Sequence, residues 1–351
     1  MKKPTKHTTL GKTALRVPAI MFGTSCLGNL YQALSQDTKL AIVREMFEYV
    51  DTPVAIDSAG KYGAGLALEV LGSCLQQLGI RSKDVVISNK LGWARVPLKT
   101  PEPTFEPGAW VDLEYDAEQD ISYQGILRCW EQGCELLGEN YAPQIVSVHD
   151  PDEYLAHARS DDERKKRTDD LLEAYRALSE LKQKGLVAAI GVGSKDWQSI
   201  KAIHQEIRLD WAMLANSLTI YAHPPALLDF VQELHQQEVS IVNSAVFHAG
   251  FLTGGAYFNY KKLDPENPED QPMFQWRKTF FRVCEHYNVL PAEACVQFGM
   301  SPPGVISIAL NTSKPERVQQ NAASVEATIP AAFWDALKSV GLIAHNYPYL
   351  G

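Results

Sequence analysis

The sequence predicts an α/β fold of the (β/α)8 TIM barrel type, and three observations support this prediction. Eight short apolar runs recur along the 351 residues, an amphipathic segment follows each run, and no Gly-rich dinucleotide turn follows the first. The runs are rich in Val and Ile and mostly do not alternate with polar residues, which is typical of parallel strands buried on both faces. They cover residues 19–23, 54–57, 85–90, 145–150, 187–193, 211–216, 239–244 and 304–310.

The segments between the runs have the spacing of helices. Leu171, Tyr175 and Leu178 recur on one helical face, and Gly185 is placed to end that helix. One barrel can occupy a chain of this length, so we expect residues 1–351 to form a single barrel domain. An open, doubly wound sheet is the alternative. Such sheets usually hold their cofactor on a GxGxxG turn, and FGTSCLGN after the first run lacks that pattern.

Three further segments are predicted outside the barrel. TTLGKTALRVP near the N-terminus predicts a small hairpin that turns at Gly11 and Lys12. Two connections, about 91–121 and 245–271, are much longer than usual, and long loops in compact folds are usually functional or disordered. In a barrel both loops would rise from the C-terminal face, where the chemistry of such folds takes place.

The composition excludes several classes of protein. The net charge is −9 and no basic face is visible, which argues against a nucleic-acid partner. No uninterrupted apolar run reaches about 18 residues, and the N-terminus lacks the apolar core of a secretory signal, so we expect a cytoplasmic protein without a membrane span. The six cysteines form no Cys-x-x-Cys pair, so we expect reduced, mostly buried thiols rather than disulfides or metal ligands.

Four polar residues lie at or just beyond the ends of successive predicted strands. Asp57 ends the second strand, Lys90 the third and His149 the fourth, and Tyr62 follows Asp57 by one short turn. Each residue has an ordinary alternative, such as a helix cap for the aspartate or a solvated side chain for the lysine. Adjacent strand ends of a barrel converge on one pocket, so four such residues together favour a catalytic set.

Five sequence blocks resemble, in order, the signatures of the aldo-keto reductase superfamily. They are LGKTALRVPAIMFGTSCLG, DSAGKYGAGLALEVLG, ISNKLGW, VSVHDPD and SKPERVQQNAAS. The resemblance covers nearly the whole chain and is weakest in the two long loops. It implies a nicotinamide-dependent oxidoreductase whose catalytic residues are Asp57, Tyr62, Lys90 and His149.

The chemistry implied by this resemblance is consistent with these residue types. Tyr62 would exchange a proton with the substrate oxygen while hydride moves, although a free tyrosine ionises only near pH 10. A cation within a few ångströms favours the phenolate, which is the role implied for Lys90, with Asp57 holding it in place. His149 would orient the substrate oxygen. The sequence suggests no metal ligands, and the reaction requires no metal.

The resemblance also implies contacts to the nicotinamide end of NAD or NADP. Gly23 and Thr24 would contact the ribose, while Ser194 and Asn216 occupy positions where the family often binds the carboxamide through Asn and Gln. Ser244 is a further candidate contact at the end of the seventh strand. Many members stack a tyrosine on the nicotinamide. Here the alignment offers Asn243, with Phe247 nearby, and neither residue is assigned to that role.

The segment ALNTSKPERVQQN resembles the family's adenosine-phosphate block. Ser313 and Glu316 are spaced as a capping box, so the N-terminus of a helix would face an anion there; an ordinary capped surface helix is the alternative. Asn311 and Ser313 stand where NADP-preferring members often carry Lys or Arg, so NAD is favoured over NADP. The residues implied to hold the adenosine end are Arg317, Gln320, which replaces a common Glu, and Asn321.

Within the superfamily the sequence is similar to the sugar 1-dehydrogenases, and pyridoxal dehydrogenases share much of this similarity. The first hypothesis is therefore an NAD(P)-dependent dehydrogenase that oxidises an aldose such as L-fucose, L-galactose or D-arabinose at C1 to the lactone. The alternatives are an NADPH-dependent general aldehyde or ketone reductase and a cofactor-binding regulatory subunit. Trp93 and Trp110 of the 91–121 loop are predicted to pack against the sugar, or else only to hold that loop on the barrel.

Overall fold

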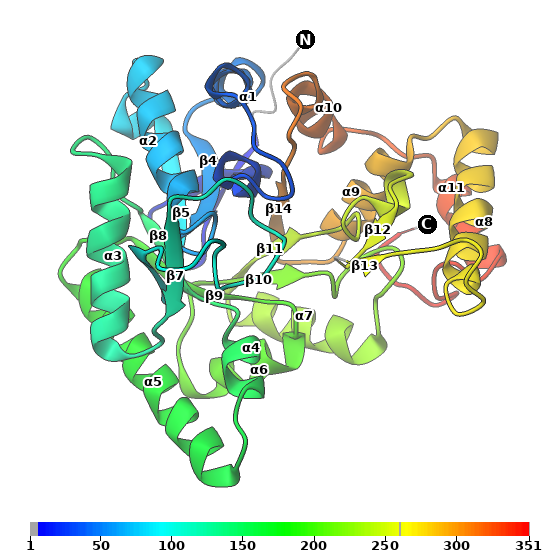
Figure 1. Cartoon of the computed structure of the whole chain (residues 1–351). Coiled ribbons are helices and arrows are strands. Elements are labelled where there is room, and N and C mark those ends of the chain that lie inside the picture. The colour runs from blue at the N-terminus through cyan, green and yellow to red at the C-terminus, as the bar shows by residue number, and fades with distance from the viewer. Residues whose placement is uncertain (1–5, 260, 351) are drawn as a thin grey trace.

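The computed structural model describes residues 6–259 and 261–350, and at its centre eight parallel strands form a closed barrel (Figure 1). The predicted barrel is confirmed, and the alternative of an open sheet is wrong. Around the barrel the strands are β3 (Ile20–Gly23), β4 (Val54–Ala59), β5 (Val85–Leu91), β8 (Ile145–His149), β9 (Ala189–Ser194), β10 (Trp211–Ala215), β11 (Ser240–Ser244) and β14 (Val305–Leu310), which pairs again with β3.

The strands β4 and β5 are buried along their whole length, as expected for parallel strands covered on both faces. They pair in a register that places Asp57 opposite Ser88 and Ala59 opposite Lys90. Both strands continue past their predicted ends, β4 to Ala59 and β5 to Leu91. Asp57 and Lys90 are therefore fixed inside strands, just before the C-terminal mouth of the barrel.

Helices cover the outside of the barrel (Figure 1). The helix α5 ends as the sequence predicts: Gly185 has a φ of +71°, and the amide of Leu186 donates a hydrogen bond to the carbonyl of Leu181. The helices after successive strands are α1 (Gln36–Tyr49), α2 (Leu66–Gln77), α3 (Tyr123–Leu137), α5 (Asp161–Gln183), α6 (Trp197–Glu206), α7 (Pro225–Gln236), α9 (Pro291–Met300) and α10 (Glu316–Ser324).

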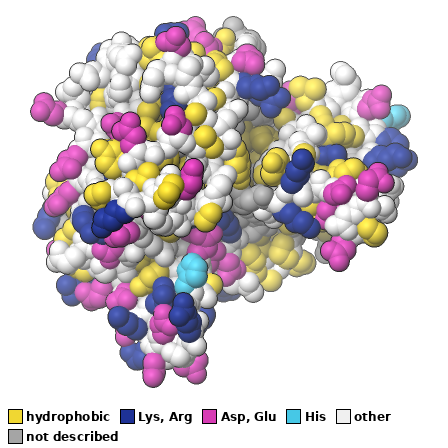
Figure 2. Space-filling view, in the orientation of Figure 1, with side chains coloured by type: hydrophobic (Ala, Val, Ile, Leu, Met, Phe, Trp, Pro, Cys, Tyr) yellow, Lys and Arg dark blue, Asp and Glu magenta, His cyan; other side chains and the backbone are white. Residues whose placement is uncertain are grey.

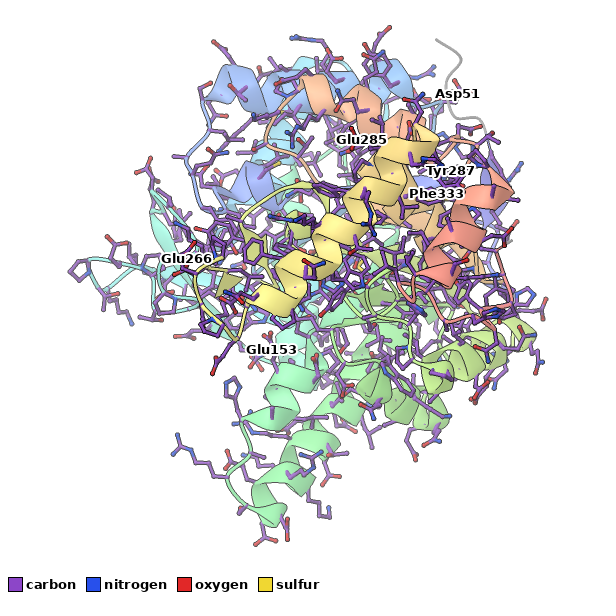
Figure 3. All side chains as sticks on the ribbon, turned by 90° about the vertical axis from the view of Figure 1, so that its right-hand side faces the viewer. Asp51, Glu153, Glu266, Glu285, Tyr287 and Phe333 are labelled. Carbon is purple, nitrogen blue, oxygen red and sulfur yellow. The ribbon has the colours of Figure 1, made fainter. Side chains whose placement is uncertain are left out.

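Three additional helices are α4 (Pro151–Ala156), α8 (Gln271–Tyr287) and α11 (Ala331–Ser339). The helices α8 and α11 pack against each other beside the barrel. Their contact includes the rings of Tyr287 and Phe333, whose centroids are 6.0 Å apart (Figure 3). Together α8 and α11 form a lobe that stands out from the barrel on one side (Figure 1).

The predicted N-terminal hairpin is confirmed as the antiparallel strands β1 (His7–Thr9) and β2 (Arg16–Pro18). It closes the N-terminal end of the barrel. At its turn the amide of Gly11 donates a 2.7 Å hydrogen bond to Ser240 Oγ, at the start of β11. Leu10 and Val17 are fully buried in one cluster with Trp211 at the start of β10. The hairpin therefore covers one end of the barrel and leaves the C-terminal end uncovered by it.

Both long connections contain secondary structure that the sequence did not predict. The first forms a hairpin of β6 (Trp93–Pro97) and β7 (Tyr115–Gln119), with Trp93 opposite Gln119. The second contains the short helix η3 (Phe251–Thr253) and the strands β12 (Tyr257–Phe258) and β13 (Lys261–Lys262). The two long connections follow the C-terminal ends of β5 and β11, as expected. Two further short helices are η1 (Ser25–Gly28) and η2 (Ser82–Asp84).

All six cysteines are free thiols, and all but Cys134 are buried. Within the described ranges no helix is long and apolar enough to cross a membrane, and no three His, Cys, Asp or Glu side chains are grouped to hold a metal ion. Residues 1–5, on which the expectation about a secretory signal partly rests, lie outside the described residues.

Two glycines allow the turn that carries Tyr62 to press against η1. A Cβ on Gly28 would lie 2.8 Å from the carbonyl of Tyr62, and a Cβ on Gly63 would overlap the carbonyl oxygen of Gly28. Gly63 also has a φ of +61°, which side chains rarely adopt. This close backbone contact sets the height of Tyr62 above the barrel.

We expect Gly63→Ala to lower the melting temperature more than Gly79→Ala does. Gly79 is a matched control because its φ is +63° and nothing lies within 4 Å of the position that a Cβ would take there. Both variants force alanine into the left-handed region at a cost of about 1–2 kcal/mol, so any excess in Gly63→Ala reports crowding against η1. Equal melting temperatures for the two variants would contradict this account.

Candidate active site

The four residues predicted to be catalytic meet at the C-terminal mouth of the barrel. Asp57, Lys90 and His149 come from the neighbouring strands β4, β5 and β8, and Tyr62 comes from the turn after β4. Lys90 Nζ donates a hydrogen bond to Asp57 Oδ2 and lies 4.9 Å from the centroid of the Tyr62 ring. The rings of Tyr62 and His149 are nearly perpendicular, with centroids 5.7 Å apart. The grouping expected from strand order is therefore present.

The ion pair between Lys90 and Asp57 is buried and well supplied with hydrogen bonds. Ser88 Oγ donates to Asp57 Oδ1 at 3.0 Å, and Lys90 Nζ also donates to the carbonyl of Ser58 at 3.3 Å. The amide and hydroxyl of Thr24 both donate to the backbone carbonyl of Asp57, at 3.1 and 3.0 Å. Such bonds offset the cost of taking two charges out of water. They hold the ammonium group beside Tyr62.

His149 is buried and neutral at pH 7. Burial lowers its pKa well below the ordinary value of 6.5, and the positive charges of Lys90, Lys61 and Lys195 lower it further. Its Nδ1 has no hydrogen-bond partner among the described residues, and its Nε2 lies 3.6 Å from Asp150 Oδ2. A neutral imidazole has one N–H donor and one acceptor nitrogen, so His149 can hold an oxygen by a hydrogen bond without carrying charge.

A second charged group beside Tyr62 was missed by the sequence analysis. Lys61 is 3% exposed, and its Nζ lies 2.7 Å from Glu106 Oε1, 3.3 Å from Glu153 Oε2 and 3.8 Å from Asp150 Oδ2. Burial lowers the pKa of Lys61, but the three carboxylates outweigh it and raise that pKa above its ordinary value. The only sequence signal was a lysine directly before Tyr62 and an acidic stretch directly after His149.

The long first loop brings aromatic rings to the same place. Trp110 packs on Tyr62 with ring centroids 5.9 Å apart, and its Nε1 donates a 2.7 Å hydrogen bond to Glu106 Oε2. Phe105 lies between Trp110 and Trp93, at 6.2 and 6.0 Å from their ring centroids. Trp93 also lies under Lys61, whose Nζ is 5.0 Å from its ring. Both predicted tryptophans therefore lie at the site, and Glu106 links Trp110 to Lys61.

The residues implied for the ribose and the adenosine end lie together on one side of the mouth. Gly23 ends β3 next to Asn311, and Asn311 Nδ2 donates a 2.7 Å hydrogen bond to Ser25 Oγ. Thr24 is buried, and its hydroxyl is bonded to Asp57 as described above. On α10, three side chains form no hydrogen bond or ion pair with another described residue: Arg317 and Gln320, which are exposed, and Asn321, which is half-buried.

The predicted capping box at α10 is wrong. The residue before the first helical turn is Pro315, and no side chain caps the helix. Thr312 Oγ1 accepts a 3.1 Å hydrogen bond from the amide of Lys314, so threonine rather than Ser313 shapes this approach. In the first turn of α10 the amides of Arg317 and Val318 already donate to the carbonyls of Lys314 and Pro315, each at 3.0 Å.

The residues implied for the carboxamide lie on the opposite side of the mouth and differ in availability. The hydroxyl of Ser194 makes both of its hydrogen bonds to the backbone of Asp196, each at 3.1 Å, and therefore serves a local turn. The side chain of Asn216 is half-buried and forms no hydrogen bond within the described part of the chain. Its neighbour Ser217 has a buried Oγ without a partner there. Asn216 and Ser217 thus fit an amide group such as that of a nicotinamide.

The seventh barrel strand, β11, offers few side chains that are free to contact a nicotinamide. Ser244 Oγ donates to the carbonyl of Leu214 at 3.2 Å. Asn243 is fully buried, and its Nδ2 donates to the carbonyls of Leu218 and Gly299, so it faces the outer packing of the barrel. Phe247 packs between two apolar clusters of the core. Figure 2 shows the surface hollowed between the barrel and the lobe that carries α8, on the side where these strands end.

Comparison with known proteins gives a consistent picture. The model of the Aldo/keto reductase family matches residues 19–341. The chain is 28% identical to a pyridoxal 4-dehydrogenase of Microbacterium luteolum, with 97% of this chain and 99% of the relative covered. It is 27% identical to a D-threo-aldose 1-dehydrogenase of Pseudomonas sp, over 94% and 95% of the two chains. It is 22% identical to an L-galactose dehydrogenase of Arabidopsis thaliana, over 90% and 86%.

Solved structures show the same fold. An aldo-keto reductase of Bacillus halodurans in its holo form superimposes with a TM-score of 0.69 at 20% identity, covering 96% of each chain. A glycerol dehydrogenase of Gluconobacter oxydans also gives a TM-score of 0.69, at 16% identity, covering 98% of this chain and 99% of the other.

We expect Glu106→Ala to lower kcat/KM for the oxidoreductase reaction about 10- to 100-fold, because the substitution frees both Trp110 and Lys61 and lets the wall beside Tyr62 move. The free energy of unfolding should fall by only about 1 kcal/mol, the usual net value of one hydrogen bond. Glu118→Ala is the matched control, since Glu118 is an exposed carboxylate on the same hairpin. Similar effects of the two variants on kcat/KM would show that the link through Glu106 has no role.

Proposed function

Because this chain belongs to the Aldo/keto reductase family, we propose that it is an NAD(P)-dependent dehydrogenase that oxidises an aldose at C1 to the lactone. The observation that supports catalysis is the Tyr62 ring above the ammonium of Lys90, which Asp57 holds from below. Two curated relatives that act on aldoses, at 27% and 22% identity, support the substrate class. The aromatic and charged lining of the mouth suits a molecule with apolar carbon faces and several hydroxyls.

In the proposed oxidation Tyr62 takes the proton of the C1 hydroxyl while the C1–H bond breaks and the lactone carbonyl forms. The positive charge of Lys90 favours the phenolate that accepts this proton. Neutral His149 holds the same oxygen by a hydrogen bond. A bound nicotinamide supplies the acceptor of the hydride. Asn216 and Ser217 would hold its carboxamide, and Arg317, Gln320 and Asn321 would hold the adenosine end.

A second candidate substrate is an aromatic one of the pyridoxal type. It is favoured by the row of rings formed by Trp93, Phe105 and Trp110, because flat faces of this kind stack on aromatic molecules. The pyridoxal 4-dehydrogenase relative, at 28% identity, supports the same candidate. A regulatory subunit that turns over little would show no activity on either class of substrate.

The test is a screen of a dozen aldoses and pyridoxal, each with NAD and with NADP. Turnover is measured by the absorbance of the reduced cofactor. We expect at least one aldose to be oxidised, and Tyr62→Phe to reduce its turnover about 10²–10⁴-fold, the usual contribution of a positioned general acid/base. Cofactor affinity should remain nearly unchanged in that variant. A fall of less than tenfold would remove Tyr62 from the mechanism, and oxidation of pyridoxal alone would select the second candidate.

We also expect NAD to be used at least as well as NADP. Each charge-assisted contact to a 2′-phosphate contributes about 1.5–3 kcal/mol, and Asn311 and Ser313 provide none. Lys314 and Arg317 are the exposed cations in this block. Ranking the two cofactors by kcat/KM, in the native enzyme and in Arg317→Ala, tests this expectation. A tenfold or larger preference for NADP in the native enzyme would contradict it.

A further inference from the structure

The carboxylate of Asp150 lies at the mouth, among positive charges. The residue as a whole is 8% exposed and its side chain 11%. Three side-chain nitrogens lie within 4 Å of its Oδ2 but beyond hydrogen-bond distance: His149 Nε2 at 3.6 Å, Lys195 Nζ at 3.7 Å and Lys61 Nζ at 3.8 Å. A carboxylate that is paired only at this range and partly open to the mouth can accept a hydrogen bond from a bound molecule.

The two lysines near Asp150 are held by other carboxylates. Lys61 Nζ is 2.7 Å from Glu106, and Lys195 Nζ is 2.6 Å from Glu153 on α4. Each of the two lysines therefore lies closer to a glutamate than to Asp150. Burial raises its pKa to about 6, and the lysines only partly oppose that effect. A carboxylate in this position lowers the stability of the folded protein at neutral pH, so stability does not account for it.

The backbone at Asp150 is left-handed, with a φ of +45° and a ψ of +57°, a conformation that aspartate adopts more readily than most residues. Its amide donates a 3.1 Å hydrogen bond to the carbonyl of Gly193 on β9. Asp150 is thereby anchored directly after β8, with its Oδ2 3.6 Å from His149 Nε2.

We propose that Asp150 is a specificity residue whose carboxylate accepts a hydrogen bond from a substrate hydroxyl on the carbon next to the reacting one. This inference rests on the proposed function, in which His149 holds the C1 oxygen. Vicinal oxygens are separated by a single carbon–carbon bond, so a substrate oxygen at His149 brings its neighbour within reach of Asp150 Oδ2. The hydroxyl donates a hydrogen bond to this carboxylate, whose neighbouring nitrogens lie beyond hydrogen-bond distance.

The test compares substrates that differ only in this hydroxyl. An oxidised aldose is paired with its 2-deoxy analogue, and lactaldehyde is paired with propanal in the reductive direction. The measured quantity is the ratio of kcat/KM within each pair, which is independent of the fraction of active enzyme. We expect the native enzyme to favour the hydroxylated member about 10- to 100-fold, the value of a hydrogen bond to a charged group.

Asp150→Ala should bring both ratios close to one, and Asp150→Asn should retain part of the preference because its amide oxygen still accepts. Asp162→Asn, an exposed carboxylate on α5, is the control and should leave the ratios at the native value. The inference is overturned if the native enzyme shows no preference, or if the ratios survive in Asp150→Ala.

The two hypotheses fail in distinguishable ways. If no aldose is oxidised but Asp150→Ala abolishes the preference for lactaldehyde over propanal, the proposed function is wrong and the role of Asp150 stands. If aldoses are oxidised and the discrimination against 2-deoxy analogues is the same in Asp150→Ala, the proposed function stands and the role of Asp150 is wrong.

Discussion

The buried ion pair between Asp57 and Lys90 is the interaction on which the rest of the site depends. Two charges inside a barrel are tolerated only when they are paired and hydrogen-bonded, and here Ser88 and the carbonyl of Ser58 complete the set. The pair forms because β4 and β5 are neighbours in a parallel register. Thr24 ties β3 to the same point. Removing either partner would leave an uncompensated charge in the barrel, so fold and site are coupled through one contact.

The positive charges at the mouth also determine what the neighbouring groups can do. Burial and three lysines keep His149 neutral, which suits it to hold an oxygen by a hydrogen bond. The pKa of Asp150 shifts in the opposite direction from that of His149. Its pKa is raised from 3.8 to about 6, so the stability linked to its protonated form is complete below about pH 4 and is lost as the pH rises through 6. The folded chain thus retains a charge that weakens it at neutral pH, beside a histidine kept neutral.

The sequence was sufficient for the barrel and for the grouping of Asp57, Lys90 and His149, because parallel strand order brings strand ends together whatever the loops do. It was insufficient wherever a contact depends on loop conformation. Lys61 meets Glu106 only because the first long loop folds back as a hairpin, whose strand signal in the sequence is short and interrupted by prolines. It meets Glu153 because the short helix α4 follows β8. The residue that stacks on the nicotinamide could not be assigned for another reason: one position along a strand decides whether a side chain such as Asn243 faces the mouth or the outer packing.

The site therefore has a rigid half and a half that sequence change can alter more easily. Asp57, Lys90 and His149 are fixed by strands, while Glu106, Phe105 and Trp110 are held on a loop. Lys61 joins the two halves, since it lies directly before Tyr62 in the chain and binds Glu106 across space. The loop that forms one wall of the mouth is therefore tied, through the ion pair between Glu106 and Lys61, to the residue directly before Tyr62.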